Sequence, residues 1–373
     1  MVSNVPLVRE LGAGRVQLEL AEELRSRGHT VETFDVLDAF PRGVRRTRFR
    51  PTPFKGRARR LVQSEGARFD VIDALQSALP YDKFDLGFEG LLVSRSTGLS
   101  SFYRDFARYA GDRWPHLVPG TRLGRAARRV SDHRLHRDFL TSMRVCDLAL
   151  LLTPEEADWL QNAFGASDRW VVLPNGLSAA HAEALNRARR PTAERLRGRE
   201  VSYIGTWDLR KGAADWPAIA GGIRGRVPSV RILLLGTGQA SIPDLGPGTR
   251  VVPAFAPSAL PSLLAEAAVG LCPSYTEGWG LGLLEQLTAG IPTVAYASSG
   301  PRAILSDIDD SLLVPCGDVD RIAGRAADLL ELSTDELDEL AGRCAAGAAR
   351  YRWSEIAHRT EALYSERLGR LDR

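Results

Sequence analysis

The chain has 373 residues and a net charge of +3, with 44% hydrophobic and 25% charged residues, the composition of a globular protein long enough for two domains. No apolar run reaches the roughly 20 residues that a membrane-spanning helix needs, and the first residues lack the basic start and apolar region of a signal peptide. The four cysteines form no Cys-x-x-Cys pair, which argues against a zinc site or a disulfide framework and fits a reducing cytoplasm.

The N-terminal residues predict a glycine loop followed by a helix. Residues 15–27 form an amphipathic helical pattern that ends at Gly28, and a strand is expected over 30–34. Gly12 and Gly14 precede the helix, and a glycine loop at a helix N-terminus lets backbone N–H groups approach a phosphate. Only a handful of residues come before the loop, so either the first strand is very short or the chain starts inside a longer protein.

Basic residues are concentrated in the first half of the chain. Residues 1–150 hold 26 Lys/Arg against 18 Asp/Glu, and the remainder holds 23 against 28. Nine basic residues occur without an acid between them: Arg42, Arg45, Arg46, Arg48, Arg50, Lys55, Arg57, Arg59 and Arg60. Two interpretations stay open, a solvated surface or attraction to an anionic membrane or a phosphate-bearing acceptor. Nucleic acid is not expected, because no recognised binding module accompanies the charge.

A clear helix start follows the weakly periodic residues 36–140. Thr153 is the expected N-cap, Pro154 the first helical residue and Glu156 the capping-box acid. A short strand over 170–173 comes next.

The second half alternates short apolar runs with helical patterns. Strands are predicted at 201–205, 231–236, 250–254, 269–274, 292–296 and 311–314, with helices at 259–268, 281–290 and 321–332. Most strands are continuously apolar, as expected for parallel strands covered on both faces. This alternation predicts a doubly wound parallel sheet, preceded by a domain boundary within 178–199.

Two loops after strands could bind phosphate. The glycines at 236–238 suggest a dinucleotide fingerprint, but residues 242–243 are Ile-Pro instead of a helix start and no third glycine is in place, so an NAD site is rejected. Lys211 follows a strand at the carboxyl end of the sheet, where ligands bind in α/β folds. With Arg210 and Gly212 beside it, Lys211 is a candidate for binding a diphosphate.

Glu277 and Glu285 are separated by seven residues that include three glycines and a tryptophan. Glu277 is expected on a loop after a strand, and the amides of Gly278 to Gly280 would form a diphosphate cradle at the start of the next helix. Glu285 lies about one turn inside that helix, where its carboxylate can accept two hydrogen bonds from a vicinal diol such as a ribose.

This segment, with residues 286–294, resembles the Glu-x7-Glu motif of the retaining GT-B glycosyltransferases of family 4. The resemblance covers about residues 201–316, with further matches at 171–177, around Gly12 and in the tail at 353–364. It implies a GT-B fold, with two Rossmann-like doubly wound parallel-sheet domains facing across a cleft and a C-terminal helix that crosses back to the first domain. The expected domains are 1–185 with the helix 352–373 on the acceptor side, and 198–350 for the nucleotide sugar.

The resemblance implies a role for each matching residue. Glu277 would contact the donor sugar as the catalytic residue, Glu285 would bind the ribose, and Gly12 would approach the diphosphate from the other domain. The remaining candidates for donor binding are Thr206, Arg210, Lys211, Gly278, Trp279, Gly280 and Leu281. In the front-face mechanism usually proposed, the departing diphosphate helps to deprotonate the acceptor. No metal and no cofactor are implied, because the nucleotide sugar is the substrate.

The chain departs from the family pattern at two positions. Many relatives have an arginine where this chain has Thr206, so that diphosphate contact is missing or comes from Arg210. Many also have a histidine in the first domain where Thr97 stands, and none of the six histidines has an equivalent context.

The expected function is a retaining glycosyltransferase that moves a hexose to a glycan, glycolipid or metabolite acceptor in cell-envelope polysaccharide assembly. It would work in the cytoplasm or peripherally on the inner face of the membrane. The alternative is a catalytically silent GT-B protein that binds a nucleotide or a partner. A sugar-nucleotide epimerase of the same fold would need further acid/base carboxylates and histidines that the sequence does not place.

Overall fold

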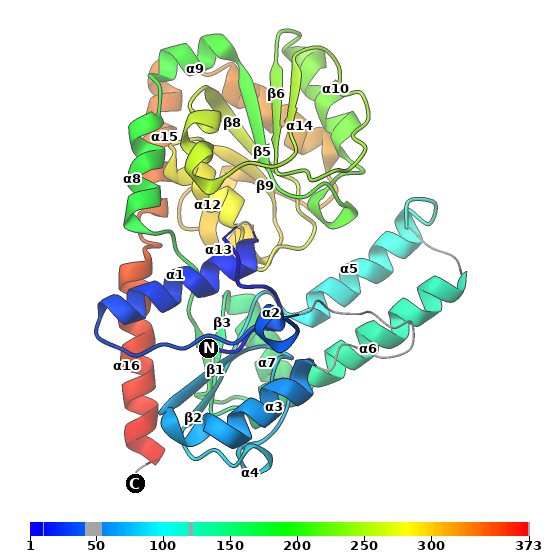
Figure 1. Ribbon diagram of the computed structural model, residues 1–373. Coiled ribbons are helices and arrows are strands. Elements are labelled where there is room, and N and C mark those ends of the chain that lie inside the picture. The colour runs from blue at the N-terminus through cyan, green and yellow to red at the C-terminus, as the bar shows by residue number, and fades with distance from the viewer. Residues whose placement is uncertain (10, 42–53, 119–121, 372–373) are drawn as a thin grey trace. The chain divides into compact units, whose positions relative to one another are not determined.

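The computed structural model describes residues 1–9, 11–41, 54–118 and 122–371 (Figure 1). Contacts divide the chain into two compact units. The first unit consists of Met1–Asn175 and Trp353–Arg373, and the second unit consists of Gly176–Arg352. Each contains a sheet in which all paired strands are parallel, so the predicted α/β fold with two parallel-sheet domains is confirmed.

The first unit has a four-stranded sheet in the order β1-β2-β3-β4. The strands are β1 (Val71–Leu75), β2 (Leu91–Arg95), β3 (Leu148–Leu151) and β4 (Trp170–Val172). The helices are α1 (Gly12–Ser26), α2 (Val36–Ala39), α3 (Phe54–Glu65), α4 (Lys83–Leu86), α5 (Ser100–Arg113), α6 (Arg122–Val145), α7 (Pro154–Phe164) and α16 (Trp353–Leu371). Val2 forms single parallel bridges with Phe34 and Ala74. Within the described residues, the strand predicted over 30–34 is therefore reduced to a single bridge between Phe34 and Val2.

Helix α1 begins earlier than its sequence pattern indicates. The predicted glycine loop forms the first turn of the helix, which starts at Gly12. A Cβ at Gly14 would lie 2.5 Å from the carbonyl oxygen of Pro6, so close packing against the preceding backbone requires glycine at this position. The predicted end is confirmed, because Gly28 has φ +96° and its N–H donates to the carbonyl of Arg25.

Helix α7 starts as predicted, but one of its capping residues acts differently. The Thr153 side chain accepts a hydrogen bond from the N–H of Glu156, and Pro154 is the first helical residue. The Glu156 carboxylate does not close a capping box: it accepts from the N–H groups of Leu152 at 2.8 Å and Leu99 at 3.2 Å. The side chain is fully buried, and this burial raises the pKa of Glu156 to about 7.

The C-terminal helix α16 packs against α1 in the first unit (Figure 1). Its Tyr364 hydroxyl donates to the carboxylate of Asp73, which also forms a 2.7 Å ion pair with Arg95. Arg95 is only 2% exposed, and it donates a further hydrogen bond to Tyr364 at 3.2 Å. This buried network connects α16 to β1 and β2.

Tyr364→Phe is expected to lower the free energy of unfolding by about 1–3 kcal/mol, because it removes a hydrogen-bond partner from a buried charge pair. Tyr81→Phe is the matched control: its ring lies 5.0 Å from the Arg59 guanidinium, and the substitution keeps the ring. Thermal melting of both variants measures the difference. A Tyr364→Phe variant as stable as Tyr81→Phe would contradict this account.

The second unit has a six-stranded parallel sheet in the order β10-β9-β8-β5-β6-β7. The strands are β5 (Glu200–Ile204), β6 (Arg231–Leu235), β7 (Thr249–Val252), β8 (Ala267–Cys272), β9 (Thr293–Tyr296) and β10 (Leu313–Val314). The helices are α8 (Ala179–Ala188), α9 (Thr192–Gly198), α10 (Trp216–Arg226), α11 (Leu260–Leu264), α12 (Leu281–Thr288), α13 (Ser299–Leu305), α14 (Val319–Leu330) and α15 (Thr334–Ala348). All six strands predicted for this half are present. Their side chains are largely buried, except on β7.

The boundary between the units lies at Asn175/Gly176, earlier than the expected domain limits of 185 and 198. Helix α8 contacts α11 and α12, and α9 contacts β8 and α15. The reason is visible in α9, where the buried Arg195 guanidinium donates to the carbonyls of Ala267 at 2.6 Å and Gly290 at 2.9 Å. The segment expected to hold the domain boundary, residues 178–199, is therefore packed into the second unit.

The basic run of the first half lies partly outside the described residues. The basic residues that lie outside the described ranges are Arg42, Arg45, Arg46, Arg48 and Arg50. On α3, Lys55 forms a 2.7 Å ion pair with Asp138, and Arg57 and Arg59 lie over aromatic rings. Arg60 is exposed. Several of the described cations thus have partners within the first unit.

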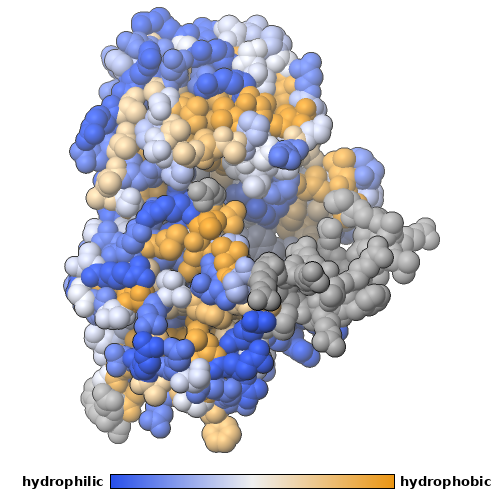
Figure 2. Space-filling model, in the orientation of Figure 1, coloured by the Kyte–Doolittle hydropathy of each residue, from blue (hydrophilic) through white to orange (hydrophobic). Residues whose placement is uncertain are grey.

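Hydrophilic and hydrophobic areas alternate over the face shown in Figure 2. Within the described part of the chain, no helix is long and apolar enough to cross a membrane. The 19-residue α16, for example, carries Glu361 and Arg367, which form ion pairs with Arg27 and Asp168.

Candidate functional site

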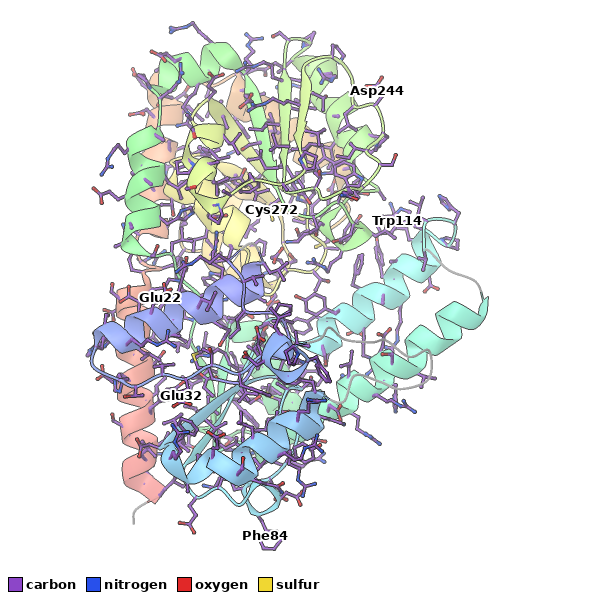
Figure 3. The ribbon with its side chains drawn as sticks, in the orientation of Figure 1. Glu22, Glu32, Phe84, Trp114, Asp244 and Cys272 are labelled. Atoms are coloured by element: carbon purple, nitrogen blue, oxygen red, sulfur yellow. The ribbon has the colours of Figure 1, made fainter. Side chains whose placement is uncertain are left out.

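The candidate site lies at the carboxyl ends of β5 and β8. These two strands are neighbours, and the chain continues outward from them in opposite directions, to β6 and β7 on one side and to β9 and β10 on the other. Loops diverge at such a point, which leaves a crevice where α/β sheets bind ligands. Cys272, the last residue of β8, is labelled in Figure 3. Most of the donor-binding residues predicted from the sequence follow one of these two strands.

Lys211 and Glu277 form an ion pair between Nζ and Oε2. Lys211 comes from the loop after β5 and Glu277 from the loop after β8, so the pair connects the two loops. The two side chains are only 16% and 13% exposed. A second link lies beside the pair, where the N–H of Tyr275 donates to the carbonyl of Arg210 at 2.9 Å.

Asp208 organises the loop that carries Lys211. Its carboxylate caps the short 3₁₀ turn Leu209–Lys211 by accepting the N–H of Lys211 at 3.1 Å. The Thr206 hydroxyl donates to the same carboxylate at 2.7 Å, and the Arg210 guanidinium lies 3.7 Å from it. Arg210 also donates to the carbonyl of Thr276 at 3.1 Å. Thr206 and Arg210 are thus near the predicted site: the Thr206 hydroxyl binds within its own loop, and Arg210 binds groups of both loops.

Gly212 lets the loop after β5 approach the loop after β8. Its φ is +81°, and a Cβ there would lie 2.3 Å from the carbonyl oxygen of Pro273. Only glycine satisfies both the backbone angle and the contact.

The segment from Gly278 to Leu281 leads into the N-terminus of α12. Gly280 has φ +103° as the residue before the helix, and a Cβ at Gly282 would lie 2.9 Å from the carbonyl oxygen of Ile204. The helix therefore starts close to the end of β5. The first N–H groups of a helix have no partner within the helix and lie at its positive end, so this backbone can bind an anion.

The Trp279 side chain packs into the second unit. It is 4% exposed, and its ring lies edge to face with Tyr351, with the centroids 4.9 Å apart. Gly300 of α13 packs on its backbone, since a Cβ there would lie 2.3 Å from the carbonyl oxygen of Trp279. The indole ring thus helps to fix the loop, and a contact of this residue with a donor, through its backbone, stays a prediction.

Glu285 lies in α12 and pairs with a residue that the sequence analysis did not select. Its Oε1 accepts a hydrogen bond from Nε2 of His181 at 3.0 Å, and the two side chains are 4% and 12% exposed. His181 comes from α8, more than 100 residues earlier in the chain. No sequence pattern links the two residues, because their contact arises from the packing of α8 on α12.

A buried carboxylate accepts a hydrogen bond from the loop after β8 and supports that loop. Asp215 is 5% exposed and accepts hydrogen bonds from the hydroxyls of Tyr275 at 2.7 Å and Tyr296 at 2.8 Å. Burial and the negative charge of Asp215 raise the pKa of Tyr296. The Tyr296 hydroxyl on β9 therefore stays protonated and remains a donor to Asp215. The bond from Tyr275 to the same carboxylate anchors the loop two residues before Glu277.

Gly12 is exposed at the first turn of α1 in the first unit, and its role toward a diphosphate stays a prediction. Among the described residues, no group of three or more His, Cys, Asp or Glu side chains is arranged to hold a metal ion.

Comparison with known proteins shows which family and which solved structures the chain resembles. Residues 228–349 match the model of the family "Glycosyl transferases group 1". The phosphatidyl-myo-inositol mannosyltransferase of Mycolicibacterium smegmatis is 29% identical over 240 residues, covering 61% of this chain and 58% of the relative. The D-inositol 3-phosphate glycosyltransferase of Acidothermus cellulolyticus is 29% identical over 238 residues, covering 57% of this chain and 52% of the relative. The matched region thus spans little more than half the length of these relatives.

Three solved structures are similar over almost the whole chain, each with 98% of both chains covered. Sucrose-phosphate synthase from Thermosynechococcus elongatus has a TM-score of 0.73 at 17% identity. WaaG, a glycosyltransferase involved in lipopolysaccharide biosynthesis, has a TM-score of 0.69 at 14% identity. Anabaena HepE, solved in complex with UDP and glucose, has a TM-score of 0.67 at 15% identity. The chain therefore has the GT-B fold, and its residues 228–349 are similar to the family "Glycosyl transferases group 1".

Proposed function

We propose that the chain is a retaining hexosyltransferase of glycosyltransferase family 4 that uses a nucleotide sugar. The acceptor is a glycan, glycolipid or metabolite, and the reaction belongs to cell-envelope polysaccharide assembly. One observation carries the proposal: Lys211, Glu277 and Glu285 lie on the loop after β5, the loop after β8 and the helix that follows it, at the switch point of the sheet. The names of the relatives, a mannosyltransferase and an inositol phosphate glycosyltransferase, support the reaction class.

The proposed donor site combines one cation with a helix N-terminus. Negative charge develops on the nucleotide diphosphate as the bond to the sugar breaks, and groups fixed in advance around that charge stabilise the transition state. Lys211 and the amides from Gly278 to Leu281 supply this positive potential, so the proposed reaction uses no metal and no cofactor. Glu277 accepts hydrogen bonds from the donor sugar, and Glu285 accepts them from the ribose. UDP and UDP-glucose, bound in the HepE structures, are the first donors to test.

The proposal also covers where the protein works. We place it in the cytoplasm, with peripheral contact to the inner face of the membrane through the basic run of residues 42–60. Glycolipid and polysaccharide acceptors are found at such a surface, and clustered Lys and Arg residues attract anionic lipids.

Binding of nucleotide sugars to the purified protein tests the proposal. A ligand that binds only the folded state at 100 times its Kd stabilises by about 2.7 kcal/mol, which for a unit of this size raises Tm by roughly 5–10 °C. We expect such a shift from one nucleotide among UDP-, GDP- and dTDP-sugars, together with slow hydrolysis of that donor. Binding without hydrolysis, and without transfer to any acceptor, would support a catalytically silent GT-B protein instead. No shift with any nucleotide sugar would contradict both.

A further inference from the structure

His181 and Glu285 form a buried pair between two helices of the second unit. The Nε2 of His181 lies 3.0 Å from the Oε1 of Glu285, and the side chains are 12% and 4% exposed. A carboxylate has no hydrogen to donate, so the imidazole is the donor. The proposed function assigns the ribose to this same carboxylate and gives His181 no role.

Both residues are held on packed helices. The N–H of His181 donates to the Ser178 hydroxyl, the N-cap of α8, at 3.3 Å. Helix α8 contacts α12, which carries Glu285, and also α11. The imidazole therefore approaches the carboxylate from a fixed direction, and residues on helices hold a ligand-binding group more precisely than residues on loops.

The pairing has a physical reason. Removing a carboxylate from water is costly unless hydrogen bonds replace the lost hydration, and Glu285 is almost fully buried. Each carboxylate oxygen can accept more than one hydrogen bond, so a bond from His181 is compatible with bonds from the two hydroxyls of a ribose. Hydrogen bonds to a charged group are also stronger and more directional than neutral ones.

We propose that His181 is a positioning residue for ribose recognition: its Nε2–H holds the Glu285 carboxylate in the orientation that accepts the vicinal diol of the nucleotide. This inference rests on the proposed function. It adds that the preference for a ribose over a sugar without the diol depends on a residue of α8, outside the loops that hold the diphosphate.

The test compares nucleotides with and without the diol. Calorimetric titration of the wild-type protein with UDP, GDP and their 2′,3′-dideoxy analogues is expected to show one ribonucleotide binding about tenfold or more tightly than its dideoxy form. In His181→Ala most of this preference is lost, while the affinity for the dideoxy form changes less than twofold. His181→Gln retains a side-chain N–H donor and recovers part of the preference.

Two further variants separate positioning from a general structural role. Glu183→Ala changes an exposed residue of the same helix and keeps the full ribose preference. In a Glu285→Gln background, His181→Ala causes no further loss of preference, because the two residues act through one carboxylate.

Three outcomes would overturn the inference. His181→Ala could retain the ribose preference, it could lower the affinities for the ribonucleotide and its dideoxy form equally, or its effect on the preference could add fully to that of Glu285→Gln. Failure of the proposed function is distinguishable, because in that case the wild-type protein binds none of the four nucleotides and no dTDP-sugar. Binding of a dTDP-sugar alone would overturn the inference and leave the proposed function standing, because its deoxyribose has no vicinal diol.

Discussion

Lys211→Ala is expected to lower kcat/KM for the nucleotide-sugar donor by about 10²- to 10³-fold, the range seen when one preorganised group is removed from a developing negative charge. Lys211 is 16% exposed and its ion pair joins the two loops of the site. The substitution removes the charge assigned to the diphosphate and leaves the Glu277 carboxylate without its ammonium partner. Initial rates of donor hydrolysis or transfer measure the effect.

Arg197→Ala is the matched control for charge, because Arg197 is an exposed cation on α9 of the same unit. We expect its kcat/KM to stay within about twofold of the wild type, since single exposed charges contribute little. If Lys211→Ala kept more than a third of the wild-type kcat/KM, Lys211 would not hold the diphosphate. A loss of activity with a large fall in Tm would instead indicate that the ion pair mainly holds the loops together.

Gly212→Ala is expected to destabilise the second unit by about 3 kcal/mol or more, because it combines a left-handed backbone angle with a severe clash. The new Cβ would lie 2.3 Å from the carbonyl oxygen of Pro273, and φ is +81°. Relief of the clash requires the loop after β5 to move away from the loop after β8. For a unit of this size the fall in Tm is about 6–12 °C. Thermal melting measures the fall, and nucleotide binding should be lost in parallel.

Gly221→Ala is the control for this substitution. Gly221 lies inside α10, and a Cβ there would meet no atom within 4 Å. Alanine in a helix interior is more favourable than glycine by about 0.5–1 kcal/mol, so Gly221→Ala should be neutral or slightly stabilising. Equal Tm values for the two variants would show that the loop tolerates a side chain at Gly212.

The candidate site was predictable where its signals are local in the chain. Glycines and charged residues directly after apolar strands indicated the loops of Lys211 and Glu277, and the structure places both at the carboxyl ends of adjacent strands. Such residues can be found because the direction of a parallel strand fixes which sheet edge its following loop reaches. The Thr153 N-cap and the Gly28 helix end were predictable for the same reason, since each depends on a few consecutive residues.

Other features depend on which helix packs against which. His181 pairs with Glu285, and α8 and α9 belong to the second unit, because segments far apart in the sequence contact one another. The bonds of Glu156 to Leu99 and Leu152 lie outside the local capping pattern. Side-chain type alone does not indicate such partners, because a histidine on a helix has many possible neighbours.

By itself the sequence determined the alternation of strands and helices in the second half, and the residue types around the paired glutamates. Apolar periodicity and turn chemistry encode these features over short distances. Only the tertiary structure decided the strand order that creates the switch point, the ion pair of Lys211 with Glu277, and the histidine behind Glu285. These depend on the free energy of packing whole elements together, which no short stretch of sequence contains.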